Sequence, residues 1–480
     1  MGLAELRGMA EKHLAVMKRL EITFPDFARW SGPVLMVLIA AAGASWLATN
    51  VQGLGERLDQ SELELDYAIG LLWWAGIAIG IWLLAGANRH LLLVGWVAKF
   101  FVVLVAMLFY EYKYRYNLDA YLYFRMVATG EHFFFPGVDW RQESWMPMFQ
   151  QTVEAETLQG QLVQNIGTEN MLRLVMVVSQ FTGPYYHALK VVFAFLGYWG
   201  IWLFYRAFVA ILGRSFPLAF YVLALYPSIL FWSSIFGKDP VFILFIGLYA
   251  YGSAVWLTRG AAVGVVWAGL AIGASYLFRP WMAAIEAIPL LLATLVRLFG
   301  WVPVTLAIAV GSVIVGLGTD LTGPLKSLKT SSFIEIMASR AEGQTGQGES
   351  GTNLTIAEAQ ELWQTPSGIA LVVFSGLFRP LPFDAKNILV AVAALENCIL
   401  LILLLVSAFK YLRWDFVKSP IILWAMTYSL IWSAAYGLII LTNFGAGMRY
   451  KLQLLPFIIL LILLLLRPEG RAALRPVAMR

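Results

Sequence analysis

"YPSILFWSSIFGKDPVFILFIGLYAYG", residues 226–252, is an apolar run that a lysine, an aspartate and a proline interrupt. Apolar segments of about 20 residues lie on both sides of this point, and a helix of that length crosses a hydrocarbon core of about 30 Å. Pro240 suits the first turn of a helix, where its missing N–H removes no hydrogen bond. The stretch therefore predicts a tight turn at Lys238 and Asp239 between two membrane-spanning helices.

The whole chain has the composition of a membrane protein. Of its 480 residues, 60% are hydrophobic and only 13% are charged, whereas a soluble domain carries about 25% charged residues. A helix satisfies its own backbone hydrogen bonds inside a bilayer, so we expect an all-α polytopic membrane protein with about twelve transmembrane helices. The apolar segments are 32–49, 67–86, 91–110, 185–206, 217–235, 240–258, 261–278, 281–299, 302–318, 388–410, 420–442 and 452–467.

The basic residues of the short loops fall on one side of this predicted topology. An excess of lysine and arginine in short loops is typical of the cytoplasmic side, so we expect both termini in the cytoplasm. The basic residues form no long cluster, and nucleic acid is therefore not an expected partner. The short-loop residues on this side are Arg89, Arg206, Arg214, Arg259, Arg297, Lys410, Arg413 and Lys418.

Both long hydrophilic stretches fall on the opposite, outer side, where we expect any chemistry to take place. The Gly-rich centre of the second stretch, 343–352, is expected to be mobile and to act either as a flexible lid over an active site or as a slack connector. The predicted organisation is a cytoplasmic amphipathic segment (1–31), three transmembrane helices (32–110), a first large outer loop (111–184), helices four to nine (185–318), a second large outer loop (319–387), helices ten to twelve (388–467) and a basic cytoplasmic tail (468–480), with short helices in the two loops.

The first outer loop contains candidate catalytic and sugar-binding residues. Asp119 in "NLDAYLYF" follows the third apolar segment closely, with Tyr123 and Arg125 behind it. Its carboxylate could act as a general base toward a hydroxyl, and the alternative is an aromatic belt at the membrane surface. Further on, "GVDWRQ" offers Asp139, Trp140 and Arg141. Tryptophan packs against sugar rings but also anchors helices at the interface.

Five basic residues stand at outer helix junctions: Lys238, Arg279, Arg379, Arg449 and Lys451. Each alone is typical of a cation that extends to the membrane surface. Together they would suit the phosphate of a lipid, because the arginine fork matches phosphate oxygens. Asp239 would hold Lys238 in place or bind a sugar hydroxyl.

The order of these features resembles that of the GT-C class of integral membrane glycosyltransferases. The resemblance covers residues 110–467, from the aspartate loop through "PSILFWSSIFGKDP" to "NFGAGMRYKLQLLPFIILLILLLL". It implies transfer of a sugar from a polyprenyl-phosphate or diphosphate carrier to a lipid-linked or glycan acceptor, with inversion at the sugar. It also implies a bacterial inner (plasma) membrane location and a role in cell-envelope or exopolysaccharide assembly. Asp119 matches the position of the catalytic base.

Two features depart from the family pattern. Three predicted helices precede the aspartate loop, where family members often have one, and the second outer loop contains no D-x-D motif. No residue is therefore assigned to a metal, although a divalent metal stays open. The four scattered histidines and the single cysteine, Cys398, do not indicate a metal cluster.

Two other functions remain open. An O-antigen-type polysaccharide polymerase or ligase would use similar chemistry on the same face of the membrane. A lipid-linked sugar flippase or secondary transporter is the other alternative, because Glu286 and Glu396 lie within predicted spans and ionisable residues there often serve transport.

Overall fold

The computed structural model describes residues 60–113, 120, 123–124, 155–306, 358, 361–362 and 365–467. These residues form helices and no β-strand, which confirms an all-α protein. Within this part of the chain, seven helices are long and apolar enough to cross a membrane, and one bent pair would add an eighth. The predicted segments that these seven helices confirm are 67–86, 91–110, 185–206, 240–258, 281–299, 388–410 and 420–442.

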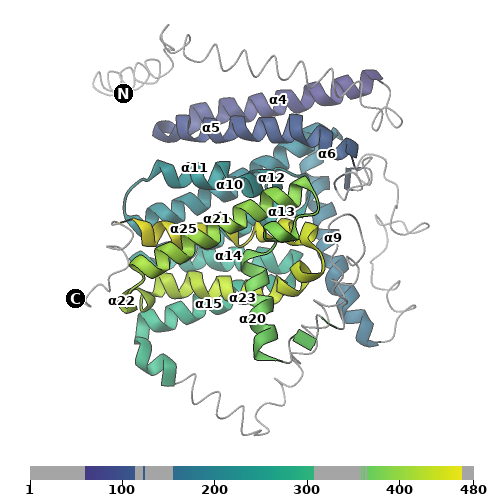
Figure 1. Cartoon of the computed structure of the whole chain (residues 1–480). Coiled ribbons are helices and arrows are strands. Elements are labelled where there is room, and N and C mark those ends of the chain that lie inside the picture. Colours follow the sequence, from purple (N-terminus) through teal and green to yellow (C-terminus); the bar gives the residue numbers. More distant parts are fainter. Residues whose placement is uncertain are drawn as a thin grey trace, which may run out of the picture.

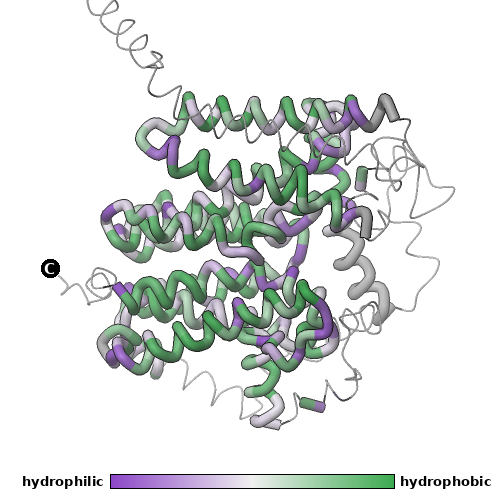
Figure 2. The backbone as a smooth tube through the Cα atoms, turned by 45° about the horizontal axis from the view of Figure 1, so that its top comes forward, coloured by the Kyte–Doolittle hydropathy of each residue, from purple (hydrophilic) through white to green (hydrophobic). Residues whose placement is uncertain are grey.

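Most of the helices run along a common direction and pack side by side (Figure 1). Hydrophobic residues occupy their lengths, and hydrophilic residues gather at their ends (Figure 2). The chain is therefore a multi-pass membrane protein. The expected total of about twelve spans stays a prediction, because the segment 32–49 and most of 302–318 lie outside the described residues.

The first described helices form a hairpin. Helix α4 (Gln60–Leu84) is followed by α5 (Arg89–Phe100), a π-helical stretch (Phe101–Ala106) and α6 (Met107–Lys113). The wider π-helical turn changes the regular backbone hydrogen bonding, and the carbonyl of Leu104 there accepts a hydrogen bond of 2.5 Å from the Tyr67 hydroxyl. The hairpin lies as a layer against α10 (Figure 1).

Helices α10 (Tyr186–Leu212) and α13 (Lys238–Arg259) pack against each other through glycine. A Cβ atom on Gly247 would overlap the backbone carbonyl of Gly200, and one on Gly200 would overlap the backbone at Ile243. In a membrane, where lipid is as apolar as a leucine side chain, small residues allow two backbones to approach closely. The absence of side chains at these two positions therefore permits the contact.

One predicted span is wrong as a single helix. The segment 217–235 consists of α11 (Pro217–Leu225) and α12 (Pro227–Trp232), separated by Tyr226 in an extended conformation. The residue before a proline is pushed out of the helical region by the proline ring, so Pro227 explains the break. Residues 233–237 then leave the helix before α13 begins at Lys238.

The last predicted span, 452–467, belongs to a bent pair of helices. Helix α24 (Phe444–Lys451) precedes α25 (Leu455–Leu466) and is bent from it by 57°. Helix α20 (Pro366–Phe378) packs against α23, where Gly437 meets the carbonyl of Val372. The remaining helices are α14 (Ala262–Phe278), α15 (Pro280–Phe299), α21 (Ile388–Tyr411), α22 (Trp414–Val417) and α23 (Pro420–Thr442).

The predicted first outer loop contains a long helix rather than only short ones. Helix α9 (Ala155–Thr182) has 28 residues and runs across one end of the helices in Figure 1. Its Asn170 side chain donates a hydrogen bond of 2.6 Å to the carbonyl of Leu277, near the end of α14. Its sequence mixes polar and apolar residues and so differs from that of an apolar span.

The contacts between connecting segments show which helix ends lie together. At one end, Arg467 lies over the Phe216 ring and the Trp301 side chain donates a hydrogen bond of 2.8 Å to the carbonyl of Lys418. The predicted cytoplasmic loops thus meet each other. Lys238 begins α13, whose other end is Arg259, and Arg279 directly follows the last residue of α14. Which end faces the cytoplasm stays a prediction.

We predict that Gly247→Val destabilises the protein, whereas Gly269→Val does not. The new side chain at position 247 would overlap the backbone of α10, while a Cβ on Gly269 meets no atom within 4 Å. Overpacking of this kind costs about 1–3 kcal/mol. The thermal stability of the purified proteins in detergent, read by size-exclusion chromatography, checks this. Equal stabilities of the two variants would contradict the glycine contact.

Candidate functional site

The candidate site is organised around the short helix α24, with the sequence FGAGMRYK. Asn443 caps this helix, because its side-chain oxygen accepts a hydrogen bond of 3.2 Å from the backbone N–H of Ala446. Arg449 and Lys451 belong to α24, and both Arg279 and Arg379 lie over aromatic rings of the same helix. Four of the five predicted phosphate-binding residues therefore meet at one element.

Arg449 of α24 forms an ion pair with Asp239 at the start of α13. The Arg449 Nε donates to the Asp239 Oδ2. The aspartate is only 1% exposed, and its other oxygen, Oδ1, has no hydrogen-bond partner among the described residues. A buried carboxylate is tolerated when a cation lies beside it. The pair therefore joins two segments that are 210 positions apart in the chain.

Arg279 lies beside this ion pair, at the junction between α14 and α15. Its guanidinium carbon is 4.4 Å from the ring centroid of Phe242 and 4.8 Å from that of Tyr450. The charges of Asp239 and Arg449 both act on it. The residue is 6% exposed, and its Nη1 atom is buried without a hydrogen-bond partner in the part of the chain that the structure describes. Arg279 is thus a buried cation with an unused donor.

Arg379 and Lys451 form a second group on another face of α24. Arg379 makes two hydrogen bonds to the carboxylate of Asp384, of which the Nε–Oδ2 bond is 3.0 Å, and lies 5.2 Å from the Phe444 ring centroid. The Lys451 Nζ donates to the carbonyl of Leu377 at 3.0 Å. Phe444 and Lys451 are seven positions apart and so share a helix face. The five predicted cations therefore do not form one group.

Lys238 contacts α9. Its Nζ donates a hydrogen bond of 2.8 Å to the hydroxyl of Thr168. The expectation that Asp239 would hold Lys238 differs from the structure, in which the ion pair of Asp239 is formed with Arg449. At the first turn of α13, adjacent side chains point in different directions by about 100°, which explains why two neighbouring residues contact different helices.

The segment that follows Asp119 lies next to the turn before Lys238. The Tyr123 ring centroid is 6.4 Å from that of Phe236, and Phe124 packs edge-on against Tyr186 at 5.3 Å. Ala120, Tyr123 and Phe124 are buried. The predicted base Asp119 and the predicted sugar-binding residues Arg125, Asp139, Trp140 and Arg141 lie outside the described residues, as does the expected lid at 343–352.

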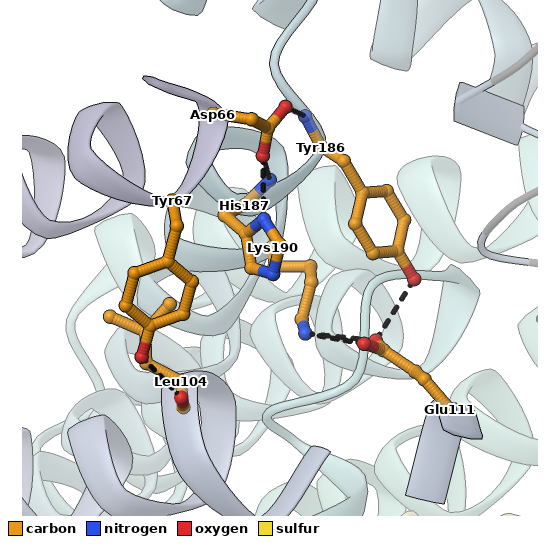
Figure 3. Close-up of polar contacts among 7 residues, drawn as sticks. All are labelled: Asp66, Tyr67, Leu104, Glu111, Tyr186, His187 and Lys190. Carbon is orange, nitrogen blue, oxygen red and sulfur yellow. Dashed lines mark hydrogen bonds and ion pairs between the residues drawn. The ribbon is translucent and has the colours of Figure 1, made fainter. Parts of the chain in front are cut away.

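The sequence interpretation missed several buried charges between helices. Asp66 and His187 are paired, as are Glu111 and Lys190 (Figure 3). The signal was present in part, because Lys190 and His187 stand inside a predicted span, where an ionisable residue usually has a function.

Lys99 was missed in the same way. It is fully buried within a predicted span, and its Nζ donates to the hydroxyls of Ser233 and Ser234, the latter at 2.9 Å. Those two serines begin the segment that leads to Lys238, so Lys99 connects α5 to the candidate site.

No group of three or more potential metal ligands occurs among the residues that the structure describes. In comparisons with protein-family models, with curated proteins and with solved structures, the chain matches none.

The bonds of Asp384 predict a pH dependence. Burial alone would raise the pKa of this carboxyl, but the hydrogen bonds from Arg379 and from the Leu381 N–H, with the Arg379 charge, lower it below its ordinary value. A lowered pKa means that the carboxylate stabilises the fold above its ordinary pKa of about 3.9. This contribution is lost as the pH falls through the lowered pKa.

We therefore expect Asp384→Asn to reduce thermal stability at pH 7, and the difference from the unsubstituted protein to shrink below about pH 4. Glu169→Gln is the control, because Glu169 pairs with Arg173 at the surface and exposed pairs contribute little. A deficit of Asp384→Asn that stays constant from pH 7 to pH 3 would refute the role of the charge.

Proposed function

We propose that the chain is an integral membrane glycosyltransferase of the GT-C type. It would move a sugar from a polyprenyl-phosphate or diphosphate carrier to a lipid-linked or glycan acceptor on the extracytoplasmic face of a bacterial inner membrane. Such a reaction belongs to cell-envelope or exopolysaccharide assembly. The observation that carries the proposal is Arg279, a buried guanidinium with an unused donor beside the Asp239–Arg449 pair.

The surroundings of Arg279 favour an anionic ligand. A buried donor without an acceptor costs free energy, and a phosphate oxygen would supply the acceptor. Phe242 and Tyr450 contact the guanidinium through their rings, and such stacking leaves the in-plane N–H groups for a ligand. Arg449 adds a second guanidinium, whose side chain is 29% exposed. Asp239 keeps this arginine near Arg279 without neutralising both charges.

The proposed reaction is a single displacement. The acceptor hydroxyl oxygen attacks the anomeric carbon of the lipid-linked sugar and forms the new glycosidic bond. The bond from that carbon to the carrier phosphate breaks, and the phosphate oxygen keeps the electron pair. The hydroxyl proton passes to the carboxylate of Asp119. Arg279 and Arg449 stabilise the charge that develops on the leaving phosphate, and attack from the opposite side inverts the anomeric centre. No metal is assigned a role.

Two alternatives differ in their products. An O-antigen-type polymerase or ligase would give a ladder of chain lengths or a transferred polymer rather than the addition of one sugar. A lipid-linked sugar flippase or transporter is favoured by Glu286, which is fully buried, accepts a hydrogen bond of 2.8 Å from Ser275 and has no described partner at Oε2. If Glu286→Gln abolished activity while Asp119→Asn kept it, transport would be the better reading.

We expect Arg279→Gln to lower the rate of sugar transfer by about 100-fold, the usual effect of removing one donor to a developing oxyanion. Arg297→Gln is the matched control, because Arg297 also lies against an aromatic ring, Trp256, but at the other end of α15. Purified membranes with a radiolabelled polyprenyl-phosphate sugar give the measurement. A similar loss in both variants would show that Arg279 acts only through the fold.

Asp119→Asn is expected to abolish transfer while leaving donor binding intact, since the amide cannot accept the hydroxyl proton. The measurement pairs the transfer assay with the mass spectrometric detection of lipids that copurify with the protein. Retention of full activity by the Asn variant would remove Asp119 from the mechanism.

A further inference from the structure

The aromatic ring of Tyr186 lies between two segments that the proposed function requires. It contacts Phe124 at 5.3 Å, in the segment that follows Asp119, and Phe236 at 6.1 Å, two positions before Lys238. Tyr123 adds a direct contact to Phe236. We call Tyr186, Phe124 and Phe236 the aromatic platform. All three side chains are buried, so the platform fixes the two segments against the same helix, α10.

Tyr186 is itself held at both of its ends by carboxylates from different helices (Figure 3). Its backbone N–H donates a hydrogen bond of 2.6 Å to Asp66 of α4, and its hydroxyl donates one of 2.9 Å to Glu111 of α6. The residue before it, Tyr185, provides no side-chain cap for α10. Asp66 therefore caps this helix from a neighbouring one, because it also accepts the N–H of His187 at 2.9 Å.

Each of the two carboxylates also contacts a charged or ionisable side chain of α10. The Lys190 Nζ lies 2.8 Å from Glu111, and His187 Nδ1 lies 2.5 Å from Asp66. Lys190 stands one turn after Tyr186, so a single helix face presents both partners of Glu111. Buried hydrogen-bonded networks of this kind restrict side chains to one arrangement. Burying these polar groups costs free energy, and a ring that served only to fill space would not need them.

We propose that Tyr186 is a positioning residue of the transferase, and that Asp66 and Glu111 orient it. The aromatic platform would hold Phe124, in the segment that follows the proposed base, at a fixed distance from Phe236, in the turn that leads to Lys238 and Asp239. This inference rests on the proposed function. The alignment of reacting groups is sensitive, since a displacement of about 1 Å can cost about 100-fold in rate.

The first test measures positioning without any activity. Hydrogen–deuterium exchange of the full chain in detergent is compared for Tyr186→Leu and for Tyr198→Leu. Tyr198 is the matched control on the same helix, because it is equally buried, packs between Trp96 and Phe220, and donates its hydroxyl to the carbonyl of Leu92. We expect faster exchange in peptides that contain residues 120–124 and 235–240 for Tyr186→Leu only.

The second test separates positioning from binding. Tyr186→Phe keeps the ring but loses the hydrogen bond to Glu111, so we expect a lower kcat, by up to about 100-fold, with an unchanged KM for the lipid-linked donor. Tyr198→Phe should change neither constant. A KM that rises with an unchanged kcat would overturn the positioning role.

The two tests also distinguish a failure of the aromatic platform from a failure of the proposed function. Unchanged exchange in both peptides of Tyr186→Leu would overturn the aromatic platform whatever the activity. If the unsubstituted protein transfers no sugar but the exchange differs as expected, the platform stands and the proposed function fails. If Tyr186→Leu does not fold, the milder Tyr186→Phe variant supplies the exchange measurement, with a smaller increase expected in the same two peptides.

Discussion

A charge that is buried among apolar helices must find its partner within the protein, because a bilayer offers no water to solvate it. The hydrophobic effect does not choose between helices in lipid, which is as apolar as their side chains. Polar contacts between helices therefore decide much of the arrangement. Asp66 and Glu111 bring the first hairpin to the start of α10, and Asp239 brings α13 to α24.

Broken helices supply these contacts at the end of the bundle that contains the candidate site. Just after α12 ends, the hydroxyls of Ser233 and Ser234 accept hydrogen bonds from Lys99. The bend between α24 and α25 turns Arg449 toward Asp239 and places Tyr450 against Arg279. Irregular backbone in a membrane protein is tolerated where the protein itself surrounds it. The same irregularity brings residues from distant parts of the chain to one place.

The sequence predicted an all-α membrane protein, because apolar segments long enough to span a bilayer recur along the chain. The sequence did not predict which charged residues would form ion pairs with each other. Asp239 stands beside Lys238 but pairs with Arg449, and Arg379 is engaged by Asp384. The role of Lys99 was not predicted, because a single charged residue within an apolar segment does not indicate which helix its side chain contacts. Helix α9 was missed because its residues are too polar to resemble a span.

The glycine contact between α10 and α13 has a mechanical consequence. Two helices whose backbones are in contact have little room to slide or rotate against each other. They therefore move as one rigid unit. The start of one carries Tyr186 and the start of the other carries Asp239. Lipid molecules of the bilayer therefore cannot enter between these two helices where Gly200 meets Gly247.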